Sequence, residues 1–277
     1  MREFRKKQKR LYNLMKAIII VGAAAIFVYI GAKPYVEDVS NTAAMICNYV
    51  CDALVIIIMV VLFTYFSKYG KSDSFLTSIE NELSDTGYYL TSRSEKETVS
   101  YTNAMLEDLK SCGYMLNSNV EINEFEFDFK AEKKKEFFYC ISLDNADRND
   151  VLAYLDCVIY DITVKNLKRK GNAVLCFITD KAEDDAIALS KMITPLGKKE
   201  QIKIAVAICE VSSGRVYFLG NVKTKCQQLT ANFVMNCDVP IKEQYIGKER
   251  LPFQDELEEK MKSFNIKDFK AGTFNAH

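Results

Sequence analysis

The stretch CNYVCDALVIIIMVVLF, residues 47–63, decides how this chain of 277 residues is organised. It lies inside a longer run, Ala43–Phe66, whose only charged residue is Asp52. A helix of that length crosses a bilayer, whose hydrocarbon core needs roughly 20 apolar residues. Tyr65 and Phe66 close the run, as expected where aromatic side chains meet a membrane surface. The sequence therefore predicts a transmembrane helix that contains an acid.

A second apolar segment, Asn13–Ala32, precedes it and carries one charge, Lys16, close enough to its start to reach the headgroups. The alternative of a cleaved signal peptide is disfavoured, because the apolar stretch is too long and another span follows at once. Pro34 and two acids lie in the connecting residues 33–42. We therefore expect an external loop that breaks the helix there and a transmembrane hairpin over residues 13–66.

The positive charges predict the orientation. Six Lys or Arg residues lie in the N-terminal segment 1–12 and two follow the second span, whereas the loop carries only Lys33 beside Glu37 and Asp38. The positive-inside rule then predicts an integral membrane protein with both termini and the main domain in the cytoplasm. Most of the nine cysteines lie at irregular spacings among apolar residues, and no Cys-x-x-Cys pair exists. That usage is typical of reduced core cysteines.

Asp52 is the residue of most interest in the spans. Asn48 lies one helical turn before it, on the same helix face. A hairpin would set Asp52 level with Ala23, within the small residues Gly22, Ala23, Ala24 and Ala25, where transmembrane helices usually pack. A carboxylate at mid-membrane costs at least about 2.5–3.5 kcal/mol, so it should face protein or water. This placement favours self-association of the hairpin. The alternative is a span that begins later and leaves Asp52 at the outer headgroups.

The rest of the chain differs in charge. The first 71 residues hold ten basic and four acidic residues, which leaves 27 basic and 33 acidic residues for the remainder. We expect a juxtamembrane linker or stalk over residues 67–96, with a short helix from Asp73 to Gly87. A cytosolic α/β domain should follow over residues 97–277.

Within that domain, helical and strand patterns alternate. Apolar runs at residues 137–143, 172–180 and 202–211 predict buried strands. The segment between the first two has acidic residues at its start and basic residues at its end, which matches the helix dipole and predicts a helix. VEINEFEFDF, residues 120–129, reads as a strand with a bulge at Asn123 and Glu124. The predicted fold is a mixed α/β sheet with helices on its faces, preceded by the two-helix hairpin.

The order of one helix, two or three strands, a helix and a strand over Glu97–Asp180 resembles the core of restriction-endonuclease-like nucleases. The resemblance implies a divalent metal held by an acid on one strand and an Asp/Glu-x-Lys on the next. Here FFYCISL, residues 137–143, has neither acid nor lysine. Asp128-Phe129-Lys130 lies at the end of the preceding strand instead. The fold can therefore hold while the chemistry is absent.

Other chemical signals are weak. The only histidine, His277, is the last residue, which argues against Ser-His and Cys-His nucleophiles. Asp180, Asp184 and Asp185 follow a strand end, where α/β sheets bind ligands, so they are candidates for a ligand or metal site. Acids in a helix's first turn also have a purely structural explanation. The sequence identifies neither the metal nor a cofactor.

Three lysine-rich stretches, 133–135, 168–170 and 198–199, could contact phosphates or anionic lipid headgroups. The lysines are dispersed in a net acidic domain, which argues against a nucleic-acid partner.

The favoured hypothesis is a membrane-anchored cytosolic module that binds a protein or small ligand, and whose hairpin contacts membrane lipid, self-associates or transmits a signal. The alternatives are a membrane-tethered hydrolase with a degenerate nuclease-like fold and a passive anchored scaffold. No catalytic residue is predicted.

Overall fold

The computed structural model describes residues 1–197, 200–241, 247–272 and 274. The chain forms two compact units. One contains Met1–Thr77 together with Glu259–His277, and the other contains Ser78–Glu258. We call them the hairpin unit and the α/β unit.

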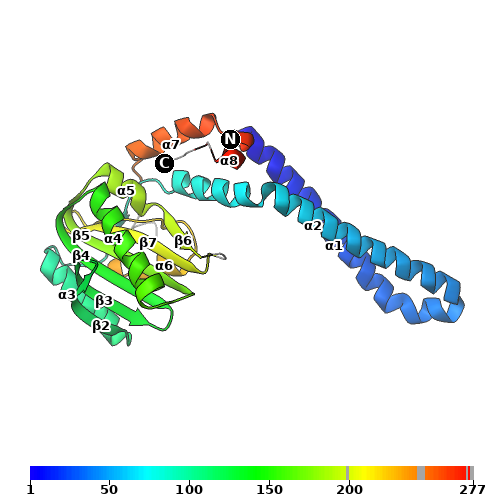
Figure 1. Ribbon diagram of the computed structural model, residues 1–277, viewed down its shortest axis with the longest axis horizontal. Helices are drawn as coiled ribbons and strands as arrows, with labels where there is room; N and C mark the ends of the chain where they lie inside the picture. Colours follow the sequence, from blue (N-terminus) through cyan, green and yellow to red (C-terminus); the bar gives the residue numbers. More distant parts are fainter. Residues whose placement is uncertain (198–199, 242–246, 273, 275–277) are drawn as a thin grey trace. The chain divides into compact units, whose positions relative to one another are not determined.

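The hairpin unit is built on two long helices, α1 (Arg2–Val39) and α2 (Asn41–Ser84), which lie side by side (Figure 1). Each contains a window of high mean hydropathy, 2.3 in α1 and 2.5 in α2, and is long and apolar enough to cross a membrane. Few of the window side chains are buried inside the protein. Both properties are compatible with an integral membrane protein.

The prediction that a loop breaks the helix over residues 33–42 is wrong. Helix α1 continues through Pro34 to Val39, and only Ser40 separates it from α2. Proline has a φ near the helical value, but inside a helix it removes one backbone hydrogen bond and its ring crowds the carbonyl group of residue i−4. The Tyr29 hydroxyl donates to the Ala44 carbonyl oxygen, and lies 3.0 Å from the Asn48 amide oxygen, which joins the helices just below the turn.

The two helices pack along a seam with the spacing of a coiled coil. The inward-facing residues of α2 recur at intervals of three and four: Ala44, Cys47, Cys51, Leu54, Ile58, Val61 and Tyr65. Those of α1 do the same at Met15, Ile19, Gly22, Ile26 and Tyr29. This repeat lets side chains of one helix fit between those of the other. Cys47 and Cys51 lie half-buried in this seam.

The base of the hairpin unit is aromatic. Phe75 of α2 stacks on Phe264 and on Phe269 of the short helix α8 (Ile266–Ala271), and Phe4 of α1 meets the edge of Phe264. Arg5 lies 2.5 Å from the carboxylate of Asp73. The C-terminal segment thus folds onto both helices of the hairpin.

The α/β unit contains one sheet with the strand order β1-β8-β7-β5-β4-β3-β2, and β6 pairs with β7. Strands β4, β5 and β7 run parallel, and the other pairs are antiparallel. The bounds are β1 Tyr89–Leu90, β2 Met115–Ile122, β3 Phe125–Lys133, β4 Glu136–Ala146, β5 Gly171–Ala182, β6 Ile193–Leu196, β7 Ile202–Glu210 and β8 Arg215–Tyr217.

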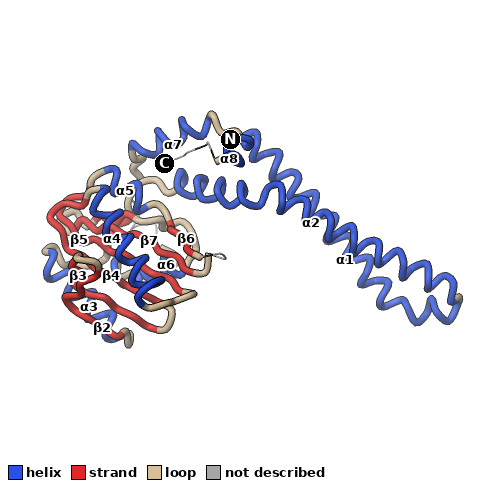
Figure 2. Tube along the Cα trace, viewed as in Figure 1, coloured by secondary structure: helices blue, strands red, loops and turns tan. Residues whose placement is uncertain are grey.

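Helices cover both faces of this sheet (Figure 2). One face packs against α3 (Thr98–Ser111), α6 (Lys225–Leu229) and the π-helical turn η2 (Thr230–Val234). The other packs against α4 (Arg148–Tyr160), the π-helical turn η1 (Asp161–Lys165) and α5 (Asp184–Ser190). Helix α7 (Pro252–Lys262) begins in this unit, and its last residues belong to the hairpin unit. The predicted mixed α/β sheet with helices on its faces is confirmed.

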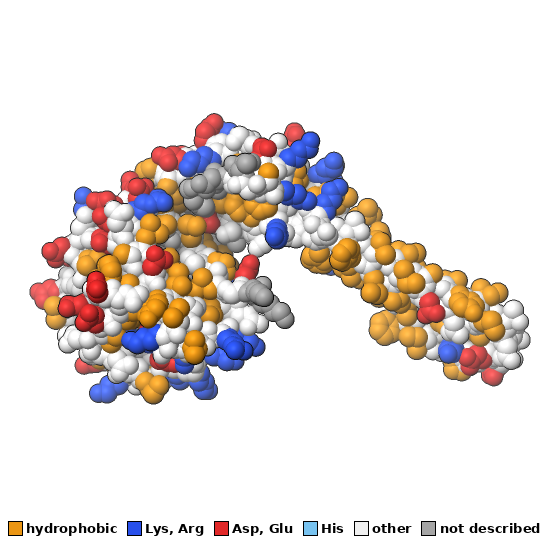
Figure 3. Space-filling view, in the orientation of Figure 1, with side chains coloured by type: hydrophobic (Ala, Val, Ile, Leu, Met, Phe, Trp, Pro, Cys, Tyr) orange, Lys and Arg blue, Asp and Glu red, His pale blue; other side chains and the backbone are white. Residues whose placement is uncertain are grey.

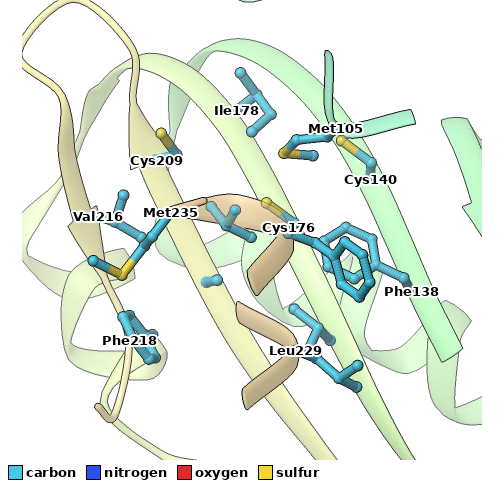
Figure 4. Packing of buried hydrophobic residues seen from close by; sticks show 14 of the residues in the cluster. Met105, Phe138, Cys140, Cys176, Ile178, Cys209, Val216, Phe218, Leu229 and Met235 are labelled. Carbon is cyan, nitrogen blue, oxygen red and sulfur yellow. The ribbon is translucent and has the colours of Figure 1, made fainter. Parts of the chain in front are cut away.

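The central strands are buried on both sides because their side chains alternate between two cores. Figure 4 shows one of them, in which Phe138 and Cys140 of β4 lie near Cys176 of β5, Met105 of α3 and Leu229 of α6. These uninterrupted apolar strands are what the sequence predicted for residues 137–143, 172–180 and 202–211.

Two local predictions are wrong. Asn123 and Glu124 form no bulge: they are the turn between β2 and β3, and both have positive φ (49° and 69°), which matches a tight hairpin turn. The helix expected from Asp73 is no separate element, because α2 runs unbroken to Ser84. Tyr89 and Leu90, within the segment expected as a linker, pair with β8 at the edge of the sheet.

Candidate functional site at the end of the long helix

The last turn of α2 enters a buried polar cluster in the α/β unit. Asp85, the residue after the helix, has a side chain only 3% exposed, and that of Lys191 is 1% exposed. Their charged atoms lie 3.0 Å apart. A charge in such surroundings is stable only if it is paired and hydrogen-bonded. Asp85 and Lys191 therefore form a buried ion pair that depends on the surrounding donors and acceptors.

Asp85 collects donors from three segments. Its Oδ2 accepts hydrogen bonds from the backbone N–H groups of Gly220 (2.7 Å) and Asn221 (3.3 Å). The Tyr89 hydroxyl donates at 3.1 Å. A Cβ at Gly220 would lie 2.4 Å from the Tyr89 ring, so only glycine allows this approach. The carboxylate is thus held by β1, by the segment after β8 and by Lys191.

The ammonium group of Lys191 is also fully hydrogen-bonded. Besides Asp85, its ammonium donates to the carbonyl oxygens of Gly87 (2.6 Å) and Phe218 (3.1 Å). Burial lowers the pKa of Lys191, and the nearby Asp85 carboxylate opposes that shift. All three ammonium protons therefore have acceptors, which suits a structural cation better than a catalytic base.

Gln254 of α7 closes the cluster. Its Nε2 donates to the carbonyl oxygens of Glu82 (3.0 Å) and Asp85 (2.8 Å), and its Oε1 accepts from the backbone N–H of Leu251 at 3.0 Å. The carbonyl groups at a helix end have no partner within the helix. Gln254 satisfies two of them, and so fixes the end of α2 to the α/β unit.

Glu82, one turn before Asp85, is also buried, and its carboxylate accepts from the Ser78 hydroxyl at 3.1 Å. Burial raises its pKa from 4.5 to about 7, against the opposing effect of Ser78. Between these values the folded chain holds a proton that the unfolded chain has lost. Stability therefore falls as the pH rises from about 4.5 to about 7.

We predict that Glu82→Gln stabilises the protein at pH 8 by up to about 3 kcal/mol, because the variant has no buried charge. At pH 4.5 the gain should largely vanish. Thermal unfolding of the full chain in detergent, measured at both pH values, tests this. Glu107→Gln, at an exposed position of α3, is the matched control. An equal gain at both pH values would contradict the assignment.

The polar residues of the predicted spans lie on the outside of the hairpin. Asn48 and Asp52 are both exposed. No hydrogen bond or ion pair joins Asp52 to any residue in the described part of the chain. Asn48 contacts Tyr29. The first helix therefore does not cover Asp52 within one chain.

The small residues of α1 divide between two surroundings. Gly22 is buried, and a Cβ there would lie 2.9 Å from Ile58 Cδ1, so it permits close helix contact. Ala23 is half-buried, whereas Ala24 and Ala25 are exposed. Of these four residues, Gly22 lies in the seam between the helices and Ala23 lies at its margin.

The candidate metal residues are dispersed. Asp180, at the end of β5, and Asp184 and Asp185, in the first turn of α5, are all exposed. Within residues 1–197, 200–241, 247–272 and 274, no group of three or more His, Cys, Asp or Glu side chains is placed to hold a metal ion. Helix dipole stabilisation accounts for the acids of α5.

The segment resembling a nuclease core has the expected order of elements, α3-β2-β3-β4-α4-β5. Its lysine, Lys130, however, pairs with an acid of the core. The ammonium of Lys130 lies 2.5 Å from Asp161 of the turn η1, and the Tyr139 hydroxyl donates to the same carboxylate at 2.7 Å. Lys130 is thus engaged in a core ion pair. No ion pair joins Lys130 to Asp128 in the described part of the chain.

The cysteine thiols of the core are unsuited to nucleophilic catalysis. Burial raises the pKa of Cys209 to about 12 and that of Cys226 to about 11. A thiol reacts as its thiolate, which is scarce at such values. The described cysteines are free, and the buried ones serve as small apolar core residues: Cys140, Cys157, Cys176, Cys209 and Cys226.

Comparison of the chain with protein families, curated proteins and solved structures found no match in any of the three. The Asp85 cluster is therefore chosen as the candidate site from its geometry alone, because it contains a buried and fully hydrogen-bonded ion pair. Sequence reasoning missed it, although Lys191 stands in an otherwise apolar segment, AIALSKMI (residues 186–193), which is a signal for a buried lysine.

Proposed function

We propose that this protein is a membrane-anchored module that binds a protein or small ligand through a cytosolic α/β unit. The hairpin crosses the membrane twice, self-associates, and passes its movements to that unit. Both termini lie in the cytoplasm, as the clustering of Lys and Arg on that side favours.

One observation carries the proposal. Helix α2 continues from its apolar segment to Ser84 without interruption. Asp85, the next residue, is held in place by hydrogen bonds from Lys191 and Gln254. A continuous helix transmits rotation or translation, because its backbone hydrogen bonds resist bending. A continuous helix between the apolar segment and the cluster suits signal transmission better than a passive anchor, for which a flexible linker would serve.

Self-association is supported by Asp52. The acid is exposed on α2 and has no partner within the described part of the chain. In a membrane it would face hydrocarbon, at the cost given above, unless another polar surface met it. A second copy of the hairpin supplies such a surface, with Asn48 and Asp52 of each chain close to those of the other.

The relay is tested by uncoupling the two units. Two glycines inserted after Thr77 should interrupt α2 at the boundary between the units, whereas seven alanines add about two full turns and preserve the phase. Amide hydrogen exchange of Gly220 and Asn221, which donate to Asp85, reports on the cluster in lipid nanodiscs.

We expect Asp52→Leu to change the exchange rates of these two amides in the native chain and in the alanine variant. In the glycine variant the change should disappear. If Asp52→Leu leaves these rates unaltered in the native chain, the hairpin does not communicate with the α/β unit and the relay is refuted.

A further inference from the structure

Strand topology gathers lysines that are scattered in the sequence. Lys133 ends β3, Lys134 and Lys135 form the turn into β4, and Lys168–Lys170 leads into β5. Because β4 and β5 are parallel, with Glu136 beside Asn172, both stretches lie at the same end of the sheet. The Asn172 N–H donates to the Lys135 carbonyl oxygen at 2.8 Å, which joins them directly. We call the six residues Lys133, Lys134, Lys135, Lys168, Arg169 and Lys170 the basic edge.

Most of this charge is available to an outside anion. Lys134, Lys135, Arg169 and Lys170 are exposed, and none has an ion pair with an acid in the described part of the chain. The acids nearest to them are already paired. Glu132 lies 2.6 Å from Lys168, and Glu136 lies 3.1 Å from Lys225. The basic edge therefore carries an uncompensated positive charge.

The opposite end of the parallel strands is acidic. Asp144 and Asp180 lie at the carboxyl ends of β4 and β5, and Asp184 and Asp185 follow in α5. In Figure 3 Lys and Arg gather along the lower margin of the α/β unit and Asp and Glu along its left margin. The net acidic composition of the domain thus conceals a positive surface at the basic edge.

Exposed apolar side chains accompany the cations. Val164 and Leu167, in the segment that leads to Lys168, are 56% and 75% exposed. Cations beside exposed apolar side chains are characteristic of surfaces that lie in the headgroup region of a membrane. A long polyanion such as RNA would gain nothing from these apolar groups, and its charge would be repelled by the acidic end.

We propose that the basic edge docks on anionic lipid headgroups of the membrane that holds the hairpin. The inference rests on the proposed membrane anchoring, which keeps the surface permanently close to lipid. Tethering turns binding into an intramolecular event with a high effective concentration, so a weak site is sufficient. The α/β unit would then respond to the lipid composition of its own membrane.

The chain contains no tryptophan, so a single introduced one reports its own surroundings. We place it at Leu167 in the full chain, in phosphatidylcholine nanodiscs and in matched discs that also contain phosphatidylserine. Energy transfer to a dansyl group on the lipid headgroups measures its proximity to the membrane. Leu152→Trp, exposed near the acidic end on α4, is the control position, and Val164→Trp replaces Leu167→Trp if that variant does not fold.

We expect transfer from position 167 to rise at least about two-fold when phosphatidylserine is present, and to fall back in 1 M salt, where the Debye length is about 3 Å. Transfer from position 152 should not change. Arg169→Glu with Lys170→Glu should abolish the rise. Arg148→Glu with Lys181→Glu, the same charge change at exposed positions near the acidic end, should preserve it.

Equal transfer in both kinds of disc would overturn the proposal. So would a response to a single-stranded RNA oligonucleotide in place of the lipid response, because the surface would then serve nucleic acid. Sodium carbonate washing of native membranes distinguishes a failure of the membrane anchoring from a failure of the lipid docking. Release of the chain refutes the anchoring itself, whereas a retained chain without a phosphatidylserine effect refutes only the docking.

Discussion

Replacement of Lys191 by methionine is expected to lower the free energy of unfolding of the α/β unit by about 3–5 kcal/mol, the usual cost of leaving one charge of a buried ion pair without its partner. For a unit of this size the melting temperature should fall by roughly 10 °C. Asp85 would keep its hydrogen bonds from Gly220 and Tyr89 but lose the positively charged partner Lys191. Thermal unfolding of the full chain in detergent, followed by circular dichroism, measures the change.

Two variants separate the ion pair from a general effect of losing lysine. Lys181→Met, at an exposed position of β5, should change stability by less than about 0.5 kcal/mol. Asp85→Asn should be less harmful in the Lys191→Met background than in the native chain, because it removes the unpaired charge and retains an acceptor oxygen. If the two substitutions are simply additive, the pair has no energetic coupling and the cluster does not anchor α2 as inferred.

Replacement of Asp52 by leucine is expected to convert an associated hairpin into a predominantly monomeric one. Polar contacts between transmembrane helices contribute about 0.6–2 kcal/mol each, and a symmetric pair of hairpins contains each contact twice. Loss of both should weaken association by roughly ten-fold or more. Counting fluorophore bleaching steps of the labelled chain in liposomes, at several ratios of protein to lipid, measures the shift.

Asp52→Asn serves as the conservative variant, because an amide still forms hydrogen bonds between chains without a charge, so association should persist. Met45→Leu alters an exposed side chain on α2 without removing a polar group, and should have no effect. An unchanged oligomeric state in Asp52→Leu would favour the alternative placement of the acid at the outer headgroups and a passive anchor.

The sequence predicted the parts of the fold that depend on continuous apolar runs. The two long helices and the central strands β4, β5 and β7 were all visible, because each of them leaves an uninterrupted apolar run in the sequence. The α/β architecture followed from their alternation. These signals are local, because the free energy of moving a side chain from water into the protein interior depends on its own apolar surface.

Short-range conformations were harder to predict. Pro34 was expected to end α1, but the helix continues through it to Val39. Asn123 and Glu124 look like a bulge because the side-chain parity changes there, and a two-residue turn changes parity in the same way. The four-residue strand β6 contains Pro195, and edge strands tolerate proline better than central ones.

The sequence by itself determined that two segments are apolar enough for a membrane, that one of them carries an acid, and that the remainder builds a mixed sheet. Only the tertiary structure decided that Asp85 meets Lys191 across 106 positions of the chain, and that two lysine stretches meet at one end of the sheet. The physical reason is that burial of apolar surface acts on each segment separately. Charge pairing depends on distances that exist only once strand order and register are fixed.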